Sequence, residues 1–455
     1  MRPLRRRVRL PDPMTGVSGP GEAGGARVSL HTIGCRLNQA ETALLADRFR
    51  ARGWRVVGRN DPADLFVVNT CSVTLGSEGK CRRLIRFLRK RCPEARVAAT
   101  GCYAELDPEA LLAIDGVVVA VGTADKARLP ELAERALAGA PPAAVRSPIE
   151  REPFTEEGAG LSLSTRANLK IQDGCDVFCS FCVIPYARGR SRSRRAGDCL
   201  REARDLAARG HREIVLSGVN LGLYRDDGAD LAGLIERLEE IPGLERIRIS
   251  SIEPMSVSPA LVARMSCSEK LCPYVHVVLQ SGDDGVLRAM NRPYGAGDFR
   301  RLLETFLARV PDLGIGTDVL VGFPGETDAA FRRTLAILED YPFVNVHVFA
   351  YSEHARTRSA RLDEKVHPET IRRRSEDARA LGRAKRRAFH GRYRGERLET
   401  LFETRDRAGR WIGHAPNYAR VAARDDRDLA NRIVAVRIDS SERDGAIGTA
   451  EGDLR

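Results

Sequence analysis

Three cysteines lie within eight residues of the segment QDGCDVFCSFCVIP, which runs from Gln172 to Pro185. Their C-x₃-C-x₂-C spacing places Cys175, Cys179 and Cys182 on one short loop. Thiolates are soft ligands that favour zinc or iron–sulfur clusters, and a structural zinc site normally takes four protein ligands. A four-iron cubane held by three cysteines keeps one iron open to a small molecule. The loop therefore predicts a [4Fe–4S] cluster at a reaction site.

Composition favours an intracellular setting for this cluster. The 455 residues include 11 cysteines and are 43% hydrophobic and 30% charged, as in globular proteins. The sequence has no apolar run of membrane-spanning length and no secretory signal. We therefore expect a cytoplasmic protein whose cysteines serve metal or redox chemistry rather than disulfides. The net charge of +12 favours a polyanionic partner, although a generally Arg-rich proteome explains the same charge.

The chain is expected to have an α/β fold in three domains. The first alternates strands and helices, which predicts a parallel sheet. The second has six strand–helix units, which predict an incomplete (β/α)₆ barrel. The third has short alternating runs broken by Gly and Asp, which predict a small all-β barrel. The expected segments are a disordered basic leader (1–25, with translation starting at Met1 or Met14), the first domain (26–139), a linker (140–160), the partial barrel (161–390) and the small barrel (391–455).

The first domain carries three further cysteines at the ends of predicted strands. Cys35 follows LHTIG, Cys71 follows FVVNT and Cys102 follows VAATG. Because the carboxyl ends of parallel strands form the edge at which such sheets bind ligands, these thiols are expected to meet in space and to bind a metal. The remaining cysteines combine neither a short thiol spacing nor a strand end, and we expect none of them to be a ligand: Cys81, Cys92, Cys199, Cys267 and Cys272.

A cysteine loop after the first strand of a six-unit barrel resembles the radical S-adenosylmethionine superfamily. The segments TIGCRLNQAE, VVNTCSVT and AATGCYA resemble the N-terminal domain of its methylthiotransferases. The resemblance implies that the loop cysteines hold a cluster that binds S-adenosylmethionine and cleaves it to a 5′-deoxyadenosyl radical. It also implies a second [4Fe–4S] cluster on Cys35, Cys71 and Cys102, which carries the sulfur to be inserted. Such a reaction uses a second S-adenosylmethionine as methyl donor and needs an electron donor and a sulfur source as partners.

The C-terminal segment resembles the TRAM domain, an RNA-binding barrel. Its mixture of aromatic and basic side chains suits base stacking and phosphate contact, and its candidate RNA contacts are Trp411, His414, Tyr418 and Arg420, with Asn417 among them. The alternative is that Trp411 and Tyr418 are core residues. The basic segment IRRRSEDARALGRAKRRAFHGRYRGER precedes it and is expected to contact phosphate. The segment ARGRSRSRR (187–195) is a further candidate for substrate contact.

The methylthiotransferase family that the chain resembles has three main branches. Two modify adenosine 37 of tRNA, which carries an N6-threonylcarbamoyl group in one branch and an N6-isopentenyl group in the other. The third modifies an aspartate of a ribosomal protein. The segments KIQDGCDVFCSFCVIPYARGRSRSR, LSGVNLGLY, RIRISSIEP and VHVFAYS most resemble the threonylcarbamoyladenosine branch. We therefore expect transfer of a methylthio group to C2 of N6-threonylcarbamoyladenosine 37 in tRNA, with the other two substrates as alternatives. A non-enzymatic iron–sulfur protein that binds RNA is the alternative of another class. Two clusters with open irons argue against it, because a structural cluster gains nothing from a missing ligand.

Overall fold

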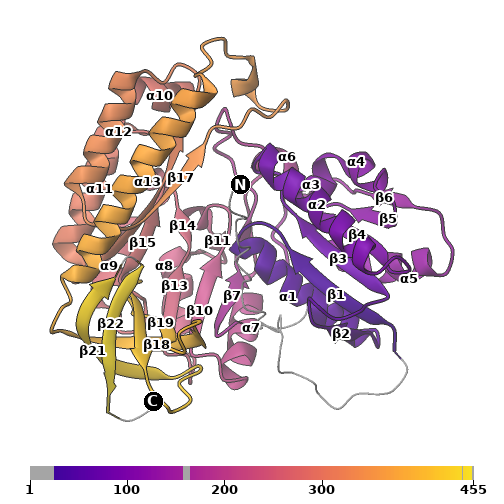
Figure 1. The fold of residues 1–455 in the computed structure, drawn as a ribbon, viewed down its shortest axis with the longest axis horizontal. Coiled ribbons are helices and arrows are strands. Elements are labelled where there is room, and N and C mark those ends of the chain that lie inside the picture. The colour runs from indigo at the N-terminus through magenta and orange to yellow at the C-terminus, as the bar shows by residue number, and fades with distance from the viewer. Residues whose placement is uncertain (1–24, 157–163, 443, 453–455) are drawn as a thin grey trace, which may run out of the picture.

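The computed structural model describes residues 25–156, 164–442 and 444–452. The leader predicted over residues 1–25 falls outside these ranges apart from Gly25, as does the end of the predicted linker. The described chain forms a sheet domain, an open barrel beside it and a small closed barrel at the foot of the open one (Figure 1). Within these ranges, no helix has the length and apolar character needed to cross a membrane.

The first domain is a parallel sheet in the order β2-β1-β3-β4-β5-β6, as predicted from its alternating pattern. Its strands are β1 (Arg27–Thr32), β2 (Arg55–Val57), β3 (Leu65–Thr70), β4 (Arg96–Gly101), β5 (Val117–Val121) and β6 (Ala143–Val145). Its helices are α1 (Arg36–Ala51), α2 (Leu75–Arg91), α3 (Cys102–Leu106), α4 (Pro108–Leu112), η1 (Lys126–Arg128) and α5 (Leu129–Leu137). Strand β6 lies inside the predicted linker, because its short Ala/Val run pairs with β5 at the sheet edge.

The second domain contains the six predicted strands as a partial barrel. These are β7 (Arg166–Lys170), β10 (Glu213–Ser217), β13 (Arg246–Ile249) with its continuation β14 (Ser251–Ile252), β15 (Tyr274–Val277), β16 (Gly314–Val321) and β17 (Phe343–Ala350). They pair in parallel in the sheets β7-β10-β13 and β14-β15-β16-β17. Apolar strand residues and the surrounding helices form one core on the outer side of the barrel. Helix α1 packs beside β7, so the first domain sits at that end of the barrel.

Helices α6 to α13 accompany these strands and short segments complete the domain. The helices are α6 (Ile184–Arg188), α7 (Ala196–Ala208), α8 (Leu231–Glu239), α9 (Pro259–Cys267), α10 (Asp284–Ala289), α11 (Ala296–Arg309), α12 (Asp328–Asp340) and α13 (Pro368–Gly391). The short segments are β8 (Gln172–Asp173), β9 (Arg192–Ser193), β11 (Arg225–Asp226), β12 (Ala229–Asp230), η2 (Leu221–Leu223), η3 (Pro254–Ser256) and η4 (Arg358–Arg361). The long helix α13 runs along β17 and leads to the third domain (Figure 1).

The third domain is a closed barrel in the order β18-β19-β20-β22-β21, in agreement with the predicted all-β fold. Its strands are β18 (Arg397–Arg405), β19 (Trp411–His414), β20 (Arg420–Arg424), β21 (Ile433–Glu442) and β22 (Gly445–Glu451). It docks on the amino-terminal end of the open barrel. Buried Arg248 of β13 donates hydrogen bonds to the carbonyl oxygens of Pro416 (2.7 Å) and Ala415 (3.2 Å). The small barrel therefore lies at the end opposite to the strand ends from which the cysteine loop emerges.

Candidate functional site: two cysteine triads at a domain interface

Cys35, Cys71 and Cys102 each follow a strand, and these strands, β1, β3 and β4, are neighbours in the sheet. Gly34 has a φ of 126°, a conformation that favours glycine, and a Cβ there would lie 3.1 Å from the Cβ of Cys71. The loop before Cys35 therefore packs directly on Cys71. Burial, and to a smaller degree the neighbouring thiols of Cys102 and Cys35, raise the pKa of the Cys71 thiol to about 12. The structure thus brings the three predicted thiols to one edge.

Cys175, Cys179 and Cys182 lie on the loop that follows β7 and β8. The loop is anchored in its middle, where the Ser180 amide donates a hydrogen bond to the carbonyl oxygen of Met290 (2.9 Å). Burial raises the pKa of Cys182 to about 12, and the thiols of Cys179 and Cys175 contribute in the same direction. A bound metal centre would hold these partly buried thiols as thiolates, because its positive charge offsets their mutual repulsion.

The two triads approach each other across the interface between the first and second domains. Helix α3 begins at Cys102, helix α6 begins two residues after Cys182, and the two helices are in contact. One small buried cluster consists of Cys102, Leu106, Val183 and Ala187. The hydroxyl of Thr123 donates a hydrogen bond across the interface to the carbonyl oxygen of Ala187 (2.8 Å). Two metal centres held by these triads would therefore flank a common interior.

A buried ion network fixes this interface. Arg188 of α6, whose side chain is 1% exposed, pairs with Glu41 of the first domain (2.8 Å) and with Asp173 of its own domain (3.0 Å). Lys170 lies 3.1 Å from Glu41, and Lys126 also pairs with it. Although burial raises it, the pKa of the Glu41 carboxyl is held well below its usual value by Arg188, Lys126 and Lys170. The network therefore fixes the cysteine-bearing segments of the two domains relative to each other.

Cations face sulfur in both triads, and this fits an anionic cluster. At Cys102, burial raises the thiol pKa while Arg188 and Lys126 oppose that rise. At the barrel loop, Nη1 of Arg292 lies 2.9 Å from Sγ of Cys179, and the same guanidinium pairs with Glu253. Each triad supplies three soft donors, and a nearby positive charge favours the thiolate form that binds iron. The residues present therefore fit a [4Fe–4S] cluster at each triad.

Several residues that shape the site carry no recognisable sequence signal. Arg292 lies far from the cysteines in sequence, and Glu41, which ends the segment TIGCRLNQAE six residues after Cys35, gives no sign there of its ion-pair partners. Arg188 lies in the segment predicted to contact substrate, but it is buried in ion pairs. Arg194 of the same segment is also fully buried, where it pairs with Asp198 (2.5 Å). These two arginines of the 187–195 segment therefore serve the fold in this structure.

Cys81 lies closer to the first triad than its place inside helix α2 predicted. Its fully buried thiol donates a hydrogen bond to the carbonyl oxygen of Cys71 (3.7 Å) and sits in the apolar core of the first domain. Cys92 caps the same helix. Cys199 and Cys272 are buried and Cys267 is exposed. That none of these five thiols is a cluster ligand remains a prediction.

Three candidate RNA contacts of the small barrel have side chains engaged within the protein: Trp411, His414 and Tyr418. The Trp411 side chain is buried in the barrel core, and its indole N–H donates to the carbonyl oxygen of Arg427 (3.0 Å). The backbone N–H of half-buried Arg420 donates to Nε2 of His390 (3.0 Å). Trp411 is therefore a core residue in this structure, which was the alternative to RNA contact.

His414 and Tyr418 face the foot of the open barrel. Tyr418 stacks on Tyr274 with ring centroids 4.4 Å apart, and its hydroxyl accepts a hydrogen bond from Arg36 (2.6 Å). His414 pairs with Glu403 (2.7 Å), and burial lowers its pKa to about 4. Their contacts hold the small barrel in place, and RNA contact by the four candidates stays a prediction.

Comparison with known proteins decides the family. The profile of the radical SAM superfamily matches residues 169–338, and that of uncharacterized protein family UPF0004 matches residues 27–122. The chain is 38% identical over 420 residues to threonylcarbamoyladenosine tRNA methylthiotransferase MtaB of Chlamydia pneumoniae, covering 91% of this chain and 96% of that one. The chain belongs to the MtaB family. The relative of the same name from Bacillus subtilis (strain 168) is 33% identical and covers 91% of this chain and 94% of its own.

The fold has neighbours among solved structures. The radical S-adenosylmethionine methyltransferase TsrM of Kitasatospora setae, solved with tryptophan and a SAM analogue, superposes with a TM-score of 0.54 at 17% identity. The match covers 71% of this chain and 73% of TsrM. At this identity the likeness concerns the fold alone. Family membership rests on the MtaB relatives, whose similarity includes both cysteine-bearing domains.

Proposed function

We propose that this protein transfers a methylthio group to C2 of N6-threonylcarbamoyladenosine at position 37 of tRNA. The observation that carries the proposal is the meeting of two three-thiol sites at one interface in a chain of the MtaB family. The relatives from Chlamydia pneumoniae and Bacillus subtilis are named for this tRNA activity, and each aligns with 91% of this chain. An electron donor and a sulfur source are needed as partners. We place the reaction in the cytoplasm, where tRNA is modified.

In this proposal each triad has a distinct task. Cys175, Cys179 and Cys182 would hold the [4Fe–4S] cluster that binds S-adenosylmethionine, and the first-domain triad would hold a second cluster. When bound, these groups supply a 5′-deoxyadenosyl radical and the sulfur to be inserted. The protein contributes position: the Glu41–Arg188 pair holds the two cysteine segments together, so that radical source and sulfur reach the same carbon.

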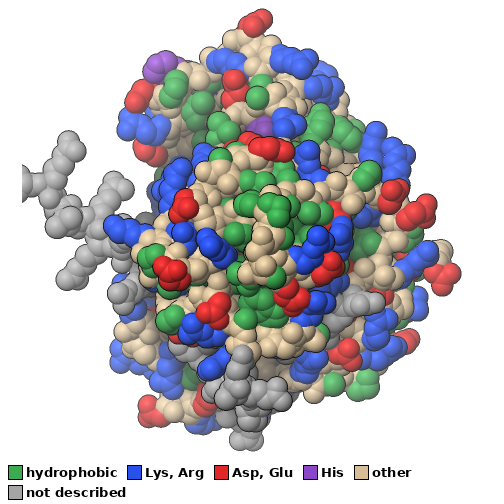
Figure 2. Space-filling view, turned by 90° about the vertical axis from the view of Figure 1, so that its right-hand side faces the viewer, with side chains coloured by type: hydrophobic (Ala, Val, Ile, Leu, Met, Phe, Trp, Pro, Cys, Tyr) green, Lys and Arg blue, Asp and Glu red, His purple; other side chains and the backbone are tan. Residues whose placement is uncertain are grey.

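Binding of tRNA is assigned to basic side chains outside the buried networks. Arg379, Arg383 and Arg387 recur at four-residue intervals and are exposed on α13, beside the small barrel. Figure 2 shows the opposite side of the molecule, where Lys and Arg side chains on the first domain are interspersed with Asp and Glu rather than gathered in one basic surface. The α13 arginines are therefore the better candidates for phosphate contact.

Iron analysis tests the two-cluster proposal. Anaerobically reconstituted protein is expected to hold about eight irons per chain, from two four-iron clusters. Replacing Cys175, Cys179 and Cys182 together by Ala should remove about half of the iron, because the remaining triad belongs to a separate domain. Loss of all iron, or zinc in place of iron, would contradict two independent clusters.

Mass spectrometry of tRNA nucleosides tests the substrate. Cells that lack the gene should lose the 2-methylthio form of N6-threonylcarbamoyladenosine and accumulate its precursor, and the wild-type gene should restore it. A gene encoding Cys179→Ala should not. If the 2-methylthio form of N6-isopentenyladenosine is lost instead, or if only a ribosomal protein loses its modification, the assigned substrate is wrong. If S-adenosylmethionine is never cleaved, the non-enzymatic alternative holds.

A further inference from the structure

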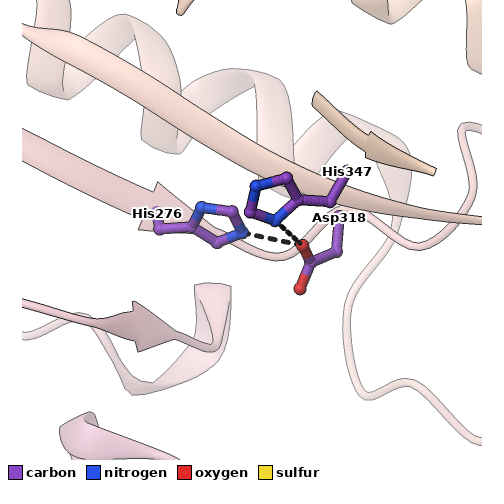
Figure 3. Close-up of side chains that lie close together, drawn as sticks. All are labelled: His276, Asp318 and His347. Carbon is purple, nitrogen blue, oxygen red and sulfur yellow. Dashed lines mark hydrogen bonds and ion pairs between the residues drawn. The ribbon is translucent and has the colours of Figure 1, made fainter. Parts of the chain in front are cut away.

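Three polar side chains converge on the inner face of the open barrel. His276 lies on β15, Asp318 on β16 and His347 on β17 (Figure 3). These strands are neighbours, and Asp318 stands opposite His347 in the register. Val275 and Val277, on either side of His276, belong to the core beneath the outer helices. Because successive strand residues point to opposite faces, the three polar side chains face the barrel interior.

Their donor atoms meet at one point. Nε2 of His276 lies 2.9 Å from Oδ1 of Asp318, and Nδ1 of His347 lies 3.2 Å from the same oxygen. One donor atom from each residue lies within 4.8 Å of the other two. A zinc-class ion sits about 2.0–2.2 Å from nitrogen and oxygen ligands, so ligands in adjacent positions are about 3.0–3.5 Å apart. The triad needs only a small adjustment to reach that geometry.

The surroundings hold the His276 ring in this orientation. Its second nitrogen, Nδ1, lies 3.3 Å from the hydroxyl of Tyr274, and a hydrogen bond on the other ring nitrogen is what orients metal-bound histidines. Gly316 pairs with His276 across the strands, and a Cβ there would lie 2.5 Å from Nδ1. Glycine at this position therefore leaves the space that the ring occupies.

Charge and exposure also fit a metal with open positions. Asp318 lies between the two histidines and supplies the one acidic ligand of the three. The His276 side chain is 6% exposed, whereas that of His347 is 53% exposed. Tyr294 connects this region to the cysteine loop: its hydroxyl donates a hydrogen bond to the carbonyl oxygen of Val278 (2.9 Å), two residues after His276, and accepts one from Arg292, which lies beside Cys179. The triad thus opens to the interior that the cysteine loop borders.

We propose that His276, Asp318 and His347 form a binding site for a divalent transition-metal ion, separate from both cysteine triads. Two imidazoles and one carboxylate are a donor set for zinc and similar ions. The remaining coordination positions face the barrel interior and take an oxygen ligand. If the proposed function holds, on which this step rests, that ligand is the threonyl carboxylate of the modified adenosine.

Zinc retention tests the site in the holoenzyme. Anaerobically reconstituted protein with its full iron content is equilibrated with zinc chloride and desalted, and both metals are measured. About one zinc per chain is expected in the wild type, and little in Asp318→Asn or His347→Asn, with iron unchanged. His354→Asn is the matched control, because His354 pairs with Glu78 (3.4 Å) but belongs to no such triad. No zinc in the wild type, or equal zinc in the triad variants, would show a purely hydrogen-bonded cluster and overturn the proposal.

Gly316→Ala provides a second variant that keeps every donor. The added methyl group would clash with the Tyr274 hydroxyl and would lie 2.5 Å from Nδ1 of His276, so the ring must move and zinc retention should fall while the iron content stays near that of the wild type. Full zinc retention would contradict the assigned His276 ligand.

Nucleoside binding tests the oxygen ligand. Zinc should tighten binding of free N6-threonylcarbamoyladenosine to the holoenzyme by about tenfold and leave adenosine binding unchanged. If zinc is retained but affects neither nucleoside, the carboxylate step is wrong and the metal site stands. Methylthiolation of tRNA is read separately, so failure of the proposed function is distinguishable from failure of the site.

Discussion

Replacing Glu41 by Gln should loosen the interface that holds the two cysteine triads. The Glu41 side chain is 4% exposed and faces Lys126, Lys170 and Arg188. Gln preserves the shape but removes the charge, so these buried cations lose their shared anion. Removing one partner of a buried ion pair costs about 3–5 kcal/mol. For a unit of 150–250 residues that free energy corresponds to a fall in melting temperature of roughly 6–20 °C.

Differential scanning calorimetry of the reconstituted protein measures this effect. Asp64→Asn is the matched control, because its pair with Arg27 is in the same domain but its side chain is 45% exposed. An exposed pair contributes about 0–1 kcal/mol, so the control should melt within about 4 °C of the wild type. A fall for Glu41→Gln no larger than that of the control would refute the role assigned to the network.

The pH dependence has a definite sign. The pKa of Glu41 is lower in the folded chain than in the unfolded one, so its contribution to stability is complete above the unfolded value of about 4.3 and is lost as pH falls through the folded value. The difference in melting temperature between wild type and Glu41→Gln should therefore be constant from about pH 6 to about pH 8. Burial lowers the pKa of Lys126, so this partner of Glu41 loses its proton at a lower pH than an exposed lysine. A difference that vanishes toward pH 6 would contradict a carboxyl held ionised by its three cationic neighbours.

Three further outcomes are expected. Cys35→Ala should spare reductive cleavage of S-adenosylmethionine and abolish sulfur insertion, because radical generation needs only the barrel loop; methylthiolated tRNA from this variant would disprove the assigned role. Ser in place of Cys81, Cys92, Cys199, Cys267 or Cys272, one at a time, should leave the iron content unchanged, and loss of a whole cluster would identify a missed ligand. The double variant Arg383→Gln/Arg387→Gln should bind tRNA more weakly. The slope of the logarithm of its binding constant against the logarithm of the salt concentration should fall by about one per lost contact. An unchanged slope in a titration at two salt concentrations would show that these two arginines do not contact phosphate.

The fold was largely predictable because its signals are local. Strand β3 starts with an apolar run, from Leu65 to Val68, and is buried on both faces, as parallel strands are; the cysteine after it stands at the ligand-binding edge. Strands β1, β3 and β4 are also neighbours in the sheet, which brings their three cysteines together; parallel pairing predicts the shared edge but not this strand order. Strand β6 was missed because three residues of Ala and Val in an Ala/Pro-rich segment carry no alternating pattern.

The surroundings of the site were not predictable, because they depend on long-range contacts. Arg188 and Glu41 are 147 residues apart and pair only after two domains have docked. His276 and His347 are polar residues within largely apolar strands, and only the register of β15, β16 and β17 aligns them with Asp318. Trp411 is of a residue type that RNA-binding surfaces use, but its side chain lies in the core of the small barrel. Burial of a single aromatic side chain cannot be read from residue type alone.

The contact between Arg36 and Tyr418 joins the first domain to the small barrel and forms late in the synthesis of the protein. These residues are separated by 382 positions, so their hydrogen bond forms only when almost the whole chain has left the ribosome. Domains generally fold as units during synthesis, the N-terminal one first, so the first sheet and its three thiols exist before the small barrel is made. Arg36 directly follows Cys35. The small barrel therefore adds this contact next to Cys35 only after the first sheet has folded, and iron delivered to the nascent chain before then would meet Cys35 while its neighbour Arg36 is not yet held by Tyr418.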